Sequence, residues 1–354
     1  MKDKTIKVAI VGLGNCASSL IQGLEYYKDV DANSEPVIGL MSNDFGGYLI
    51  KNIEIVAAFD VNANKVGQDI SSAVFAEPNC TKKISDVPEK GIIVSAGPIL
   101  DGVAPHMRER FPLIEEPGDI DSILKESGAE ILLSYLPAGS IETTYFWAEK
   151  ALEHKVAFLN AIPVFVSSDE KWSKRFAEAG VPCGGDDIKS QVGATILHRA
   201  ITQLVLDRGQ SVDDTYQLDI GGNTDFENMM TGDRYRFKRE SKTESIAWHG
   251  KIGAIKLGNV DHVPHLKDNK IAYINVRGRQ FGDIPFEIET KLSVEDSPNS
   301  AGVMVDAIRA MKLSLDRKLS GYQEWSSYFF KHPLKQYTDA EARGLVKKFA
   351  NLEK

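Results

Sequence analysis

A glycine-rich turn near the start of the chain constrains the fold more than any other feature. The run GLGNCA at residues 12–17 matches G-x-G-x-x-A, directly after the apolar segment 7–11 and before a helical segment at 17–27. Such glycines allow a tight turn and close approach of a pyrophosphate, while the helix N-terminus offers N–H groups to the anion. The turn predicts dinucleotide binding, the alternative being a glycine-rich turn that binds nothing. The candidate cofactor residues here are Gly12, Gly14, Asn15, Cys16 and Ala17.

The first two hundred residues alternate short apolar runs with helical periodicity, which is typical of βαβ units around a parallel sheet. Continuous apolar runs predict buried strands at 7–11, 54–59, 130–135 and 156–160. Helical spacing is found at 17–27, 65–75 and 140–154. Ser167 and Glu170 form a predicted capping box for a further helix, which ends at Gly180. This pattern predicts a doubly wound sheet.

After about residue 212 the pattern changes to strict alternation. Residues 216–220 and 286–294 alternate apolar and polar side chains, which predicts antiparallel strands with one polar face. Helical periodicity returns at 301–319. We therefore expect an α/β protein with a Rossmann-like doubly wound sheet, interrupted by an α+β catalytic and oligomerisation domain. The expected NAD-binding domain comprises residues 1–200 and 297–354, and the expected catalytic and tetramerisation domain comprises 201–296.

Composition restricts the class of protein further. The chain has 354 residues, enough for about two domains, and a formal net charge of -8, which argues against a nucleic-acid footprint. No run of predominantly apolar residues approaches the roughly 20 positions of a membrane-spanning helix. Cys16, Cys80 and Cys183 form neither a CxxC pair nor a disulfide framework. These features predict a cytoplasmic enzyme that binds neither nucleic acid nor membranes.

Three predicted strand ends are candidate cofactor contacts, because the carboxyl ends of parallel strands line the cofactor crevice. Asp60 is the expected ribose-binding acid, placed late in the sequence by an insertion at 28–52, and an acid there favours NAD over NADP. Ser134 and Ala161 lie in polar turns after the next two strands. A solvated acid at Asp60 and ordinary turns at the other two positions are the alternative interpretations.

Two further segments suggest anion chemistry. In the run 184–195, Ser190 is the expected N-cap of a helix whose amides would hold a phosphate; simple helix capping is the alternative. Lys238 and Lys242 are four residues apart on one helix and repel each other unless an anion lies between them, or unless the face is merely solvated. Lys331 lies among aromatic residues, where burial would lower its pKa, although such a lysine often reaches water instead.

Taken together, these motifs resemble myo-inositol-1-phosphate synthase, also called inositol-3-phosphate synthase, of the short prokaryotic type. The resemblance rests on VAIVGLGNCASSLIQGLEYY, VAAFDVNANKVG, LLSYLPAGS, NAIPVFVSSD, GDDIKSQVGAT, GGNTDF, EDSPNSAG and SSYFFKHP. It implies NAD-dependent cyclisation of D-glucose 6-phosphate to 1L-myo-inositol 1-phosphate. The sugar is oxidised at C5, enolised, closed by an intramolecular aldol reaction and reduced again, so that NAD is regenerated.

The resemblance also implies roles for individual residues. Lys238 and Lys331 would act on the C5 oxygen, Lys270 on the C1 oxygen at ring closure, and Lys242 on the substrate phosphate. Ser190 and Gln191 would form the phosphate cradle. Asp187 and Asp296 would lie near the nicotinamide and its ribose, while Asn223 and Asp225 would orient the lysines or the substrate.

Partners and alternatives complete the expectations. The resemblance implies a homotetramer and a divalent or monovalent cation, although no metal site of recognisable spacing is present. His262 and His265 beside Asp261 would be the candidate ligands, with a solvated loop the favoured interpretation. The competing functions are an NAD-dependent dehydrogenase of a phosphorylated sugar or polyol, and an NAD-sensing regulatory protein.

Overall fold

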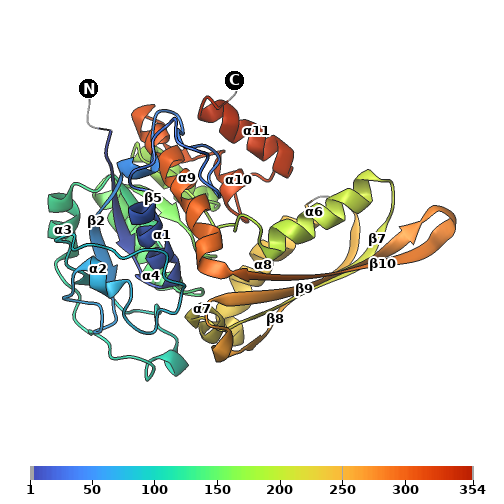
Figure 1. The fold of residues 1–354 in the computed structure, drawn as a ribbon, viewed down its shortest axis with the longest axis horizontal. Coiled ribbons are helices and arrows are strands. Elements are labelled where there is room, and N and C mark those ends of the chain that lie inside the picture. The colour runs from blue at the N-terminus through green and yellow to red at the C-terminus, as the bar shows by residue number, and fades with distance from the viewer. Residues whose placement is uncertain (1–3, 249, 353–354) are drawn as a thin grey trace.

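The protein has two parts, each built on its own sheet (Figure 1). The computed structural model describes residues 4–248 and 250–352. A seven-stranded sheet carries helices on both faces, and a four-stranded sheet extends away from it with helix α6 (Ala194–Asp207) lying along it. Among the described residues, no helix is both long and apolar enough to cross a membrane.

The larger sheet has the order β11-β6-β5-β4-β1-β2-β3, and every neighbouring pair is parallel. Its strands are β1 (Ile6–Val11), β2 (Ile53–Asp60), β3 (Ser95–Ala96), β4 (Ile131–Ser134), β5 (Ala157–Asn160), β6 (Pro182–Gly184) and β11 (Gly321–Tyr322). The run 3-2-1-4-5-6 is the doubly wound order, whose switch point lies between β1 and β4. This confirms the predicted fold class. At the switch point Val11 is aligned with Ser134, so both strands end at one edge.

Helices cover both faces of this sheet, and those predicted at 17–27, 140–154, 170–180 and 301–319 are found near these positions. The helices are α1 (Asn15–Tyr26), α2 (Ile70–Ala73), α3 (Ile120–Ser127), α4 (Ile141–Glu153), α5 (Glu170–Glu178), α9 (Asp296–Asp316), α10 (Ser326–Phe329) and α11 (Asp339–Phe349), with short 3₁₀ turns at Ile50–Asn52 and Pro105–Met107. The predicted helix 65–75 is wrong over most of its length, since only the four-residue α2 forms. Gly67, at φ +83°, interrupts it.

The predicted capping box before α5 is also wrong. Asp169 is the N-cap, and its carboxylate accepts hydrogen bonds from the amides of Lys171 at 2.9 Å and Trp172 at 3.0 Å. Ser167 is fully buried instead, and its hydroxyl has no hydrogen-bond partner within the described part of the chain. The predicted end at Gly180 is confirmed: this residue has a φ of +72° just after the helix, as glycine allows.

The smaller sheet has the order β10-β9-β7-β8. Its strands are β7 (Val212–Gly221), β8 (Ile252–His262), β9 (Asn269–Gln280) and β10 (Ile284–Glu295), with 3₁₀ turns at Pro264–Leu266 and Phe281–Asp283. The pairs β10–β9 and β9–β7 are antiparallel as predicted, but β7 and β8 run parallel. They can do so because helices α7 (Thr224–Asn228) and α8 (Gly232–Ala247) form the crossover between them.

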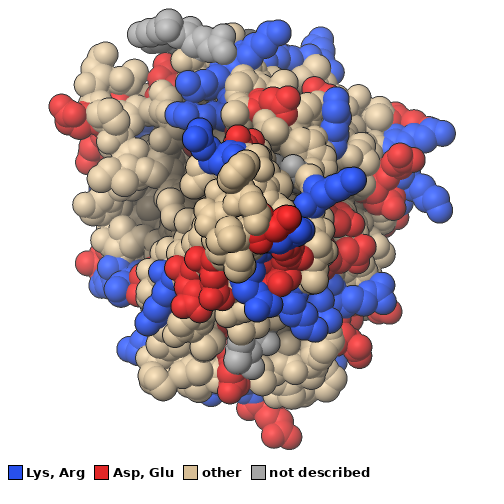
Figure 2. Space-filling model, turned by 90° about the vertical axis from the view of Figure 1, so that its right-hand side faces the viewer, with Lys and Arg blue, Asp and Glu red and all other residues tan. Residues whose placement is uncertain are grey.

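Helix α6 (Ala194–Asp207) packs its apolar side against this smaller sheet. Val205 lies with Val212, Ile274 and Val276 in one buried cluster, flanked by Ile288. Helix α6 runs across the predicted domain boundary at residue 200. The domain limits themselves remain a prediction. Figure 2 shows the far end of the sheet, where acidic and basic side chains are interspersed; Arg277 and Asp214 form one of the ion pairs in this sheet, at 2.7 Å.

The C-terminal segment returns to the larger sheet, as predicted. Helix α9 begins at Asp296, five residues before the predicted helical run, and buries Met304, Ile308 and Met311 in the main core. The guanidinium of Arg309, fully buried on α9, donates to the carbonyl oxygens of Ser42, Asn43 and Tyr48. These bonds fasten the 28–52 insertion to α9.

Candidate active site

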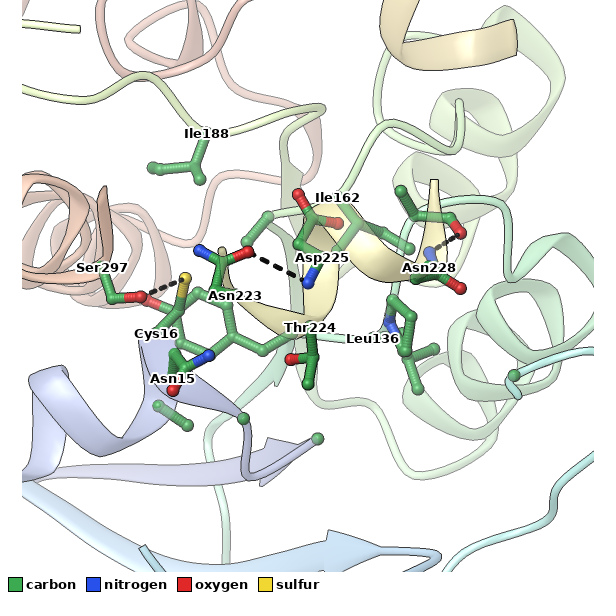
Figure 3. A pocket seen from close by; sticks show the side chains of 18 of the residues that line it. Asn15, Cys16, Leu136, Ile162, Ile188, Asn223, Thr224, Asp225, Asn228 and Ser297 are labelled. Carbon is green, nitrogen blue, oxygen red and sulfur yellow. Dashed lines mark hydrogen bonds between the residues drawn. The ribbon is translucent and has the colours of Figure 1, made fainter. Parts of the chain in front are cut away.

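A cavity opens where the carboxyl edge of the larger sheet meets the smaller sheet. Its walls come from the glycine-rich turn, the ends of β2, β4 and β5, the starts of α6, α7, α9 and β9, and α8. Figure 3 shows how Asn15 and Cys16 of α1, Leu136 after β4, Thr224 of α7 and Ser297 of α9 surround this space. Segments more than 280 residues apart in sequence therefore share one site.

The glycine-rich turn has the geometry that its sequence predicts. Gly12 has a φ of +87°, and a Cβ there would lie 2.6 Å from the Tyr135 carbonyl oxygen. A Cβ on Gly14 would meet nothing within 4 Å, so this side of the turn is open. Gly14 is the N-cap of α1 and provides no side-chain cap, which leaves the first helical amides available to an anion. Gly12, Gly14, Asn15, Cys16 and Ala17 all line the cavity.

Asp60 also lines the cavity, and its carboxylate holds the turn in place. One oxygen accepts a hydrogen bond from the Leu13 amide at 2.8 Å, and the other accepts from the amides of Val61 at 2.8 Å and Asn62 at 2.9 Å. The buried ammonium group of Lys65 donates to the Leu13 carbonyl at 2.8 Å. Both the N–H and the C=O of Leu13 are thus held by side chains, which sequence reasoning did not foresee. Ribose binding by Asp60 stays a prediction.

The other two strand-end candidates are placed differently. Ala161 lines the cavity. Ser134 is fully buried at the end of β4, and the cavity wall at this strand begins with Tyr135. The hydroxyl groups of Ser134 and Tyr135 are both buried without a hydrogen-bond partner among the described residues.

Three of the four predicted lysines reach the cavity, each beside a carboxylate. Lys238 on α8 forms an ion pair with Asp225, Lys270 on β9 lies 3.6 Å from Asp296, and Lys331 after α10 lies 2.7 Å from Asp187. Their side chains are only 13–14% exposed, so Lys331 is not directed into the solvent. The structure therefore brings together residues that the sequence separates widely.

Asp187 lies at the centre of this group. Its two oxygens accept hydrogen bonds from Lys331 Nζ at 2.7 Å and from the Ser241 hydroxyl at 2.7 Å. Burial raises the pKa of Asp187, but the charges of Lys331 and Lys238 outweigh burial and hold the pKa below its ordinary value. Asp187 is therefore an anion that organises two cations.

The two lysines nearest Asp187 differ in proton affinity. Burial lowers the pKa of Lys331, and the attraction of Asp187 does not fully compensate because Lys238 repels the same charge. Burial also lowers the pKa of Lys238, but Asp225 and Asp187 together raise it above its ordinary value. Lys331 therefore gives up its proton more readily than Lys238, and Lys238 is the more persistent cation.

Lys242 has a different environment from the other three lysines. It is 2% exposed, is not among the residues lining the cavity, and lies 2.6 Å from the buried Asp219 of β7. Burial raises the pKa of Asp219, yet Lys242 and Lys270 lower it to about 2, while Asp219 raises the pKa of Lys242. The expectation that Lys238 and Lys242 need an anion between them is corrected, because each has its own carboxylate.

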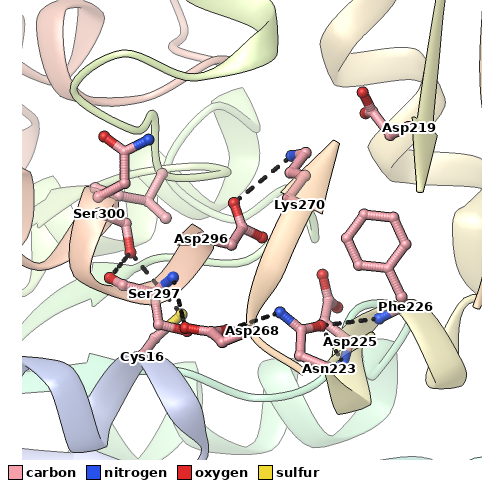
Figure 4. A network of polar contacts seen from close by, with 12 residues as sticks. Cys16, Asp219, Asn223, Asp225, Phe226, Asp268, Lys270, Asp296, Ser297 and Ser300 are labelled. Carbon is pink, nitrogen blue, oxygen red and sulfur yellow. Dashed lines mark hydrogen bonds and ion pairs between the residues drawn. The ribbon is translucent and has the colours of Figure 1, made fainter. Parts of the chain in front are cut away.

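Figure 4 shows a polar network that joins α7, β9 and α9 beside the lysines. Asn223 caps α7 through the amides of Asp225 and Phe226, and its Nδ2 donates to Asp268 at 3.0 Å. Asp268 also accepts from the Ser297 hydroxyl at 2.9 Å. Burial, with a smaller effect of Asp296, raises the pKa of Asp268 to about 6. Sequence reasoning missed Asp268, although it lies only two residues before Lys270.

The predicted phosphate cradle is only partly as expected. Ser190 lines the cavity but is not an N-cap, because α6 begins at Ala194 with Gly193 as its N-cap. The Gln191 side chain donates to the Gly39 carbonyl outside the main cavity, and the Gln191 backbone N–H donates to the Asn299 carbonyl at 2.8 Å. Gly193, Ala194 and Thr195 line the cavity instead. Since Gly193 provides no side-chain cap, the start of α6 is a second helix N-terminus available to an anion.

The possible metal ligands are not brought together. His262 Nε2 lies 3.1 Å from the Gly222 carbonyl, and neither His262 nor His265 lines the cavity. Across residues 4–248 and 250–352, the one cluster of three potential ligands is Asp121, Glu153 and His154. Lys150 already pairs with both acids of that cluster at 2.8 Å.

The fold and the cavity together define a Rossmann-type α/β protein with buried lysines facing its glycine-rich turn. Residues 193–297 match the family described as Myo-inositol-1-phosphate synthase. The chain is 49% identical to an inositol-3-phosphate synthase of Mycolicibacterium smegmatis, covering 97% of both chains. It is 48% identical to that of Corynebacterium glutamicum, covering 99% of both. The protein belongs to the inositol-3-phosphate synthase family of enzymes.

Two solved structures share the fold of the whole chain. The structure titled "Crystal structure of Ari2" has a TM-score of 0.79 at 33% identity and covers 98% of this chain and 99% of that one. A myo-inositol-1-phosphate synthase-related protein from Thermotoga maritima has a TM-score of 0.80 at 22% identity, with 98% of both chains covered, which shows a shared fold.

Proposed function

We propose that the protein cyclises D-glucose 6-phosphate to 1L-myo-inositol 1-phosphate with NAD as a regenerated cofactor. The observation that carries the proposal is the convergence of Lys238, Lys270 and Lys331 on one cavity that also contains the glycine-rich turn. A reaction that passes through an alkoxide and an enolate needs such preorganised positive charge. An ordinary dehydrogenase has no use for several convergent ammonium groups.

The residues present fit a dinucleotide. The turn is open at Gly14, the start of α1 has no side-chain cap, and the apolar side chains of Val103 and Met107 line the same cavity. Bound NAD would supply hydride acceptance at C5 and return the hydride after ring closure. Asp60 and Lys65 hold the turn ready for it.

In this mechanism the lysines divide the proton and charge work. Lys331 gives up its own proton more readily than Lys238 and, once neutral, would accept the C5 hydroxyl proton. Lys238 stays charged and would stabilise oxygen anions at C5. Lys270 stabilises the developing alkoxide at C1 during the aldol step. Asp187 and Asp225 hold Lys331 and Lys238, and Asn223 fixes the helix that carries Asp225.

The substrate phosphate is assigned to the start of α6. Ser190 lies beside the uncapped amides of Ala194 and Thr195, which suit a phosphate dianion. Gln191 supports this segment through Asn299 and Gly39 and does not reach the anion itself. The expected contact of Lys242 with the phosphate is not part of this proposal, because Lys242 does not line the cavity and its ammonium group is paired with Asp219.

A single incubation tests the proposed function. With glucose 6-phosphate and NAD, the synthase yields phosphate that periodate releases, without a lasting rise in NADH absorbance. A lasting, stoichiometric rise would support a dehydrogenase of a phosphorylated sugar or polyol. Cofactor binding without turnover would support a regulatory protein.

We further propose a homotetramer, a cytoplasmic location and a role in inositol and phospholipid biosynthesis. Phe281, at the tip of the β9–β10 hairpin, is fully exposed, and the apolar side chains of β10 are only half-buried, which suits contact between copies. Cys16, Cys80 and Cys183 are free thiols, as suits a reducing compartment. Light scattering that shows a monomer at micromolar concentration would refute the tetramer, and activity after chelation tests for a divalent-cation requirement.

A further inference from the structure

Residues 187–189, which lead into the proposed phosphate site, pair with residues 329–331 as a short antiparallel ladder. The amide of Lys331 donates to the Asp187 carbonyl at 2.8 Å, and the amide of Lys189 donates to the Phe329 carbonyl at 2.8 Å. Ile188 and Phe330 form a bridge between them. The ladder is what places Lys331 beside Asp187, 144 residues away in sequence.

Lys189 is the last residue of this ladder and directly precedes Ser190. It is 2% exposed, and its side chain points away from the main cavity into a second one beneath α11. Its ammonium group donates to the Ser327 carbonyl at 2.8 Å and lies 3.6 Å from Asp339, the first residue of α11. No interpretation of the sequence assigned Lys189 a role.

Asp339 connects Lys189 to the helices that form the cavity. The same carboxylate lies 3.1 Å from the fully buried guanidinium of Arg199 on α6. Arg199 in turn donates to the Ser245 hydroxyl on α8 at 3.1 Å, and α8 carries Lys238. One carboxylate therefore links the phosphate-binding segment to α6 and, through Arg199, to α8.

The geometry points to Lys189 as a positioning residue, held by Asp339, that fixes the segment Ser190–Thr195 relative to Lys331. The inference rests on the proposed function, because it explains how the phosphate site and the proton acceptor keep their separation. A substrate held at its phosphate would reach Lys331 correctly only if this separation is maintained.

The charges around Lys189 explain why Asp339 matters. Burial, the neighbouring Arg199 and, to a smaller extent, Lys331 lower the pKa of Lys189 to about 7, although Asp339 raises it. Removing the Asp339 carboxylate would take away an ion-pair partner from both Lys189 and Arg199 and would favour the neutral form of Lys189. Asp339→Asn should therefore act in the same direction as Lys189→Met.

The test compares Lys189→Met, Asp339→Asn and their double variant with wild type, using Lys174→Met as the control. Lys174 is an exposed lysine, 76% accessible, with its own acid partner Glu178 at 3.8 Å. We expect kcat/KM for glucose 6-phosphate to fall about 100-fold in Lys189→Met, with KM raised at least tenfold. NAD affinity, measured by fluorescence titration, should stay within about twofold, and Lys174→Met should match wild type.

The double variant should lose no more than Lys189→Met alone, because both changes break one link. If the losses in kcat/KM of the two single variants multiply in the double variant, Lys189 does not act through Asp339. Unchanged KM in folded Lys189→Met, or a parallel loss of NAD affinity, would overturn the positioning role. If Lys189→Met does not fold, Asp339→Asn decides by the same criteria. An inactive wild type overturns the proposed function and this inference with it, whereas an active wild type with unaffected variants overturns the inference alone.

Discussion

The two sheets contribute to the cavity by different physical means. The seven-stranded sheet offers backbone: a turn opened by Gly14, uncapped amides at the start of α1 and the ends of parallel strands. The parts joined to the four-stranded sheet offer most of the charge, with Lys238 and Lys270 held near carboxylates and largely buried. Lys331, which follows α10 beside the larger sheet, adds the third ammonium group through its pairing with Asp187. Backbone recognition needs only local conformation, whereas buried charge needs partners from elsewhere in the chain.

The largest effect should separate the two regions by function. We expect Lys238→Ala to lower turnover of glucose 6-phosphate about 10³-fold, because a preorganised positive charge is lost from the reacting oxygen. NAD affinity should remain within a few-fold, since the turn would hold the pyrophosphate through backbone amides and Lys238 is paired with Asp225. Initial rates and fluorescence titration measure the two quantities; a proportional loss of NAD binding would show that the regions do not divide the work.

The second prediction concerns stability. Lys242→Met should destabilise the protein by about 3 kcal/mol, because it leaves the fully buried Asp219 charged and unpaired. Urea unfolding monitored by tryptophan fluorescence measures the change. Lys242→Met combined with Asp219→Leu should recover much of the loss. Equal destabilisation of the single and double variants would contradict the ion-pair explanation.

The third prediction is the pH dependence of the same pair. The pKa of Asp219 is lowered to about 2 in the folded protein, below an unfolded value of about 3.9. Its ionised form therefore adds stability that is fully present above about pH 4 and is lost as the pH falls toward 2, by about 2 kcal/mol. Urea unfolding midpoints measured at pH 5, 4 and 3 should fall less steeply with decreasing pH in Asp219→Asn than in wild type. Equal slopes would show that Asp219 is not a source of the pH dependence of stability.

The smallest effect tests the backbone side of the comparison. Gly14→Ala should weaken NAD binding about tenfold, because the added Cβ enters the open side of the turn where a pyrophosphate would lie. Thermal stability without cofactor should not change, as nothing lies within 4 Å of that Cβ. Gly12→Ala is the contrasting variant, since its strained φ and the Tyr135 carbonyl at 2.6 Å should also lower the melting temperature.

Much of the larger sheet was predictable because its signals are local. The strands β1, β2, β4 and β5 match predicted apolar runs, and the turn is found where its glycines predict it. Errors arose where tertiary contacts chose between local options: Asp169 replaced Ser167 as a cap, and the smaller sheet paired β7 with β8 in parallel. Alternation reveals a two-faced strand but not the direction of its neighbour.

The sequence by itself determined the dinucleotide-type turn, the doubly wound sheet and the family, since each depends on residues close together in the chain. Only the tertiary structure decided which lysines reach the cavity. Lys242 and Lys238 are one helical turn apart, yet one is paired with Asp219 behind the wall and the other faces the site. The physical reason is that a buried lysine is stable only beside a carboxylate, and the partners Asp225 and Asp219 come from other elements of the chain.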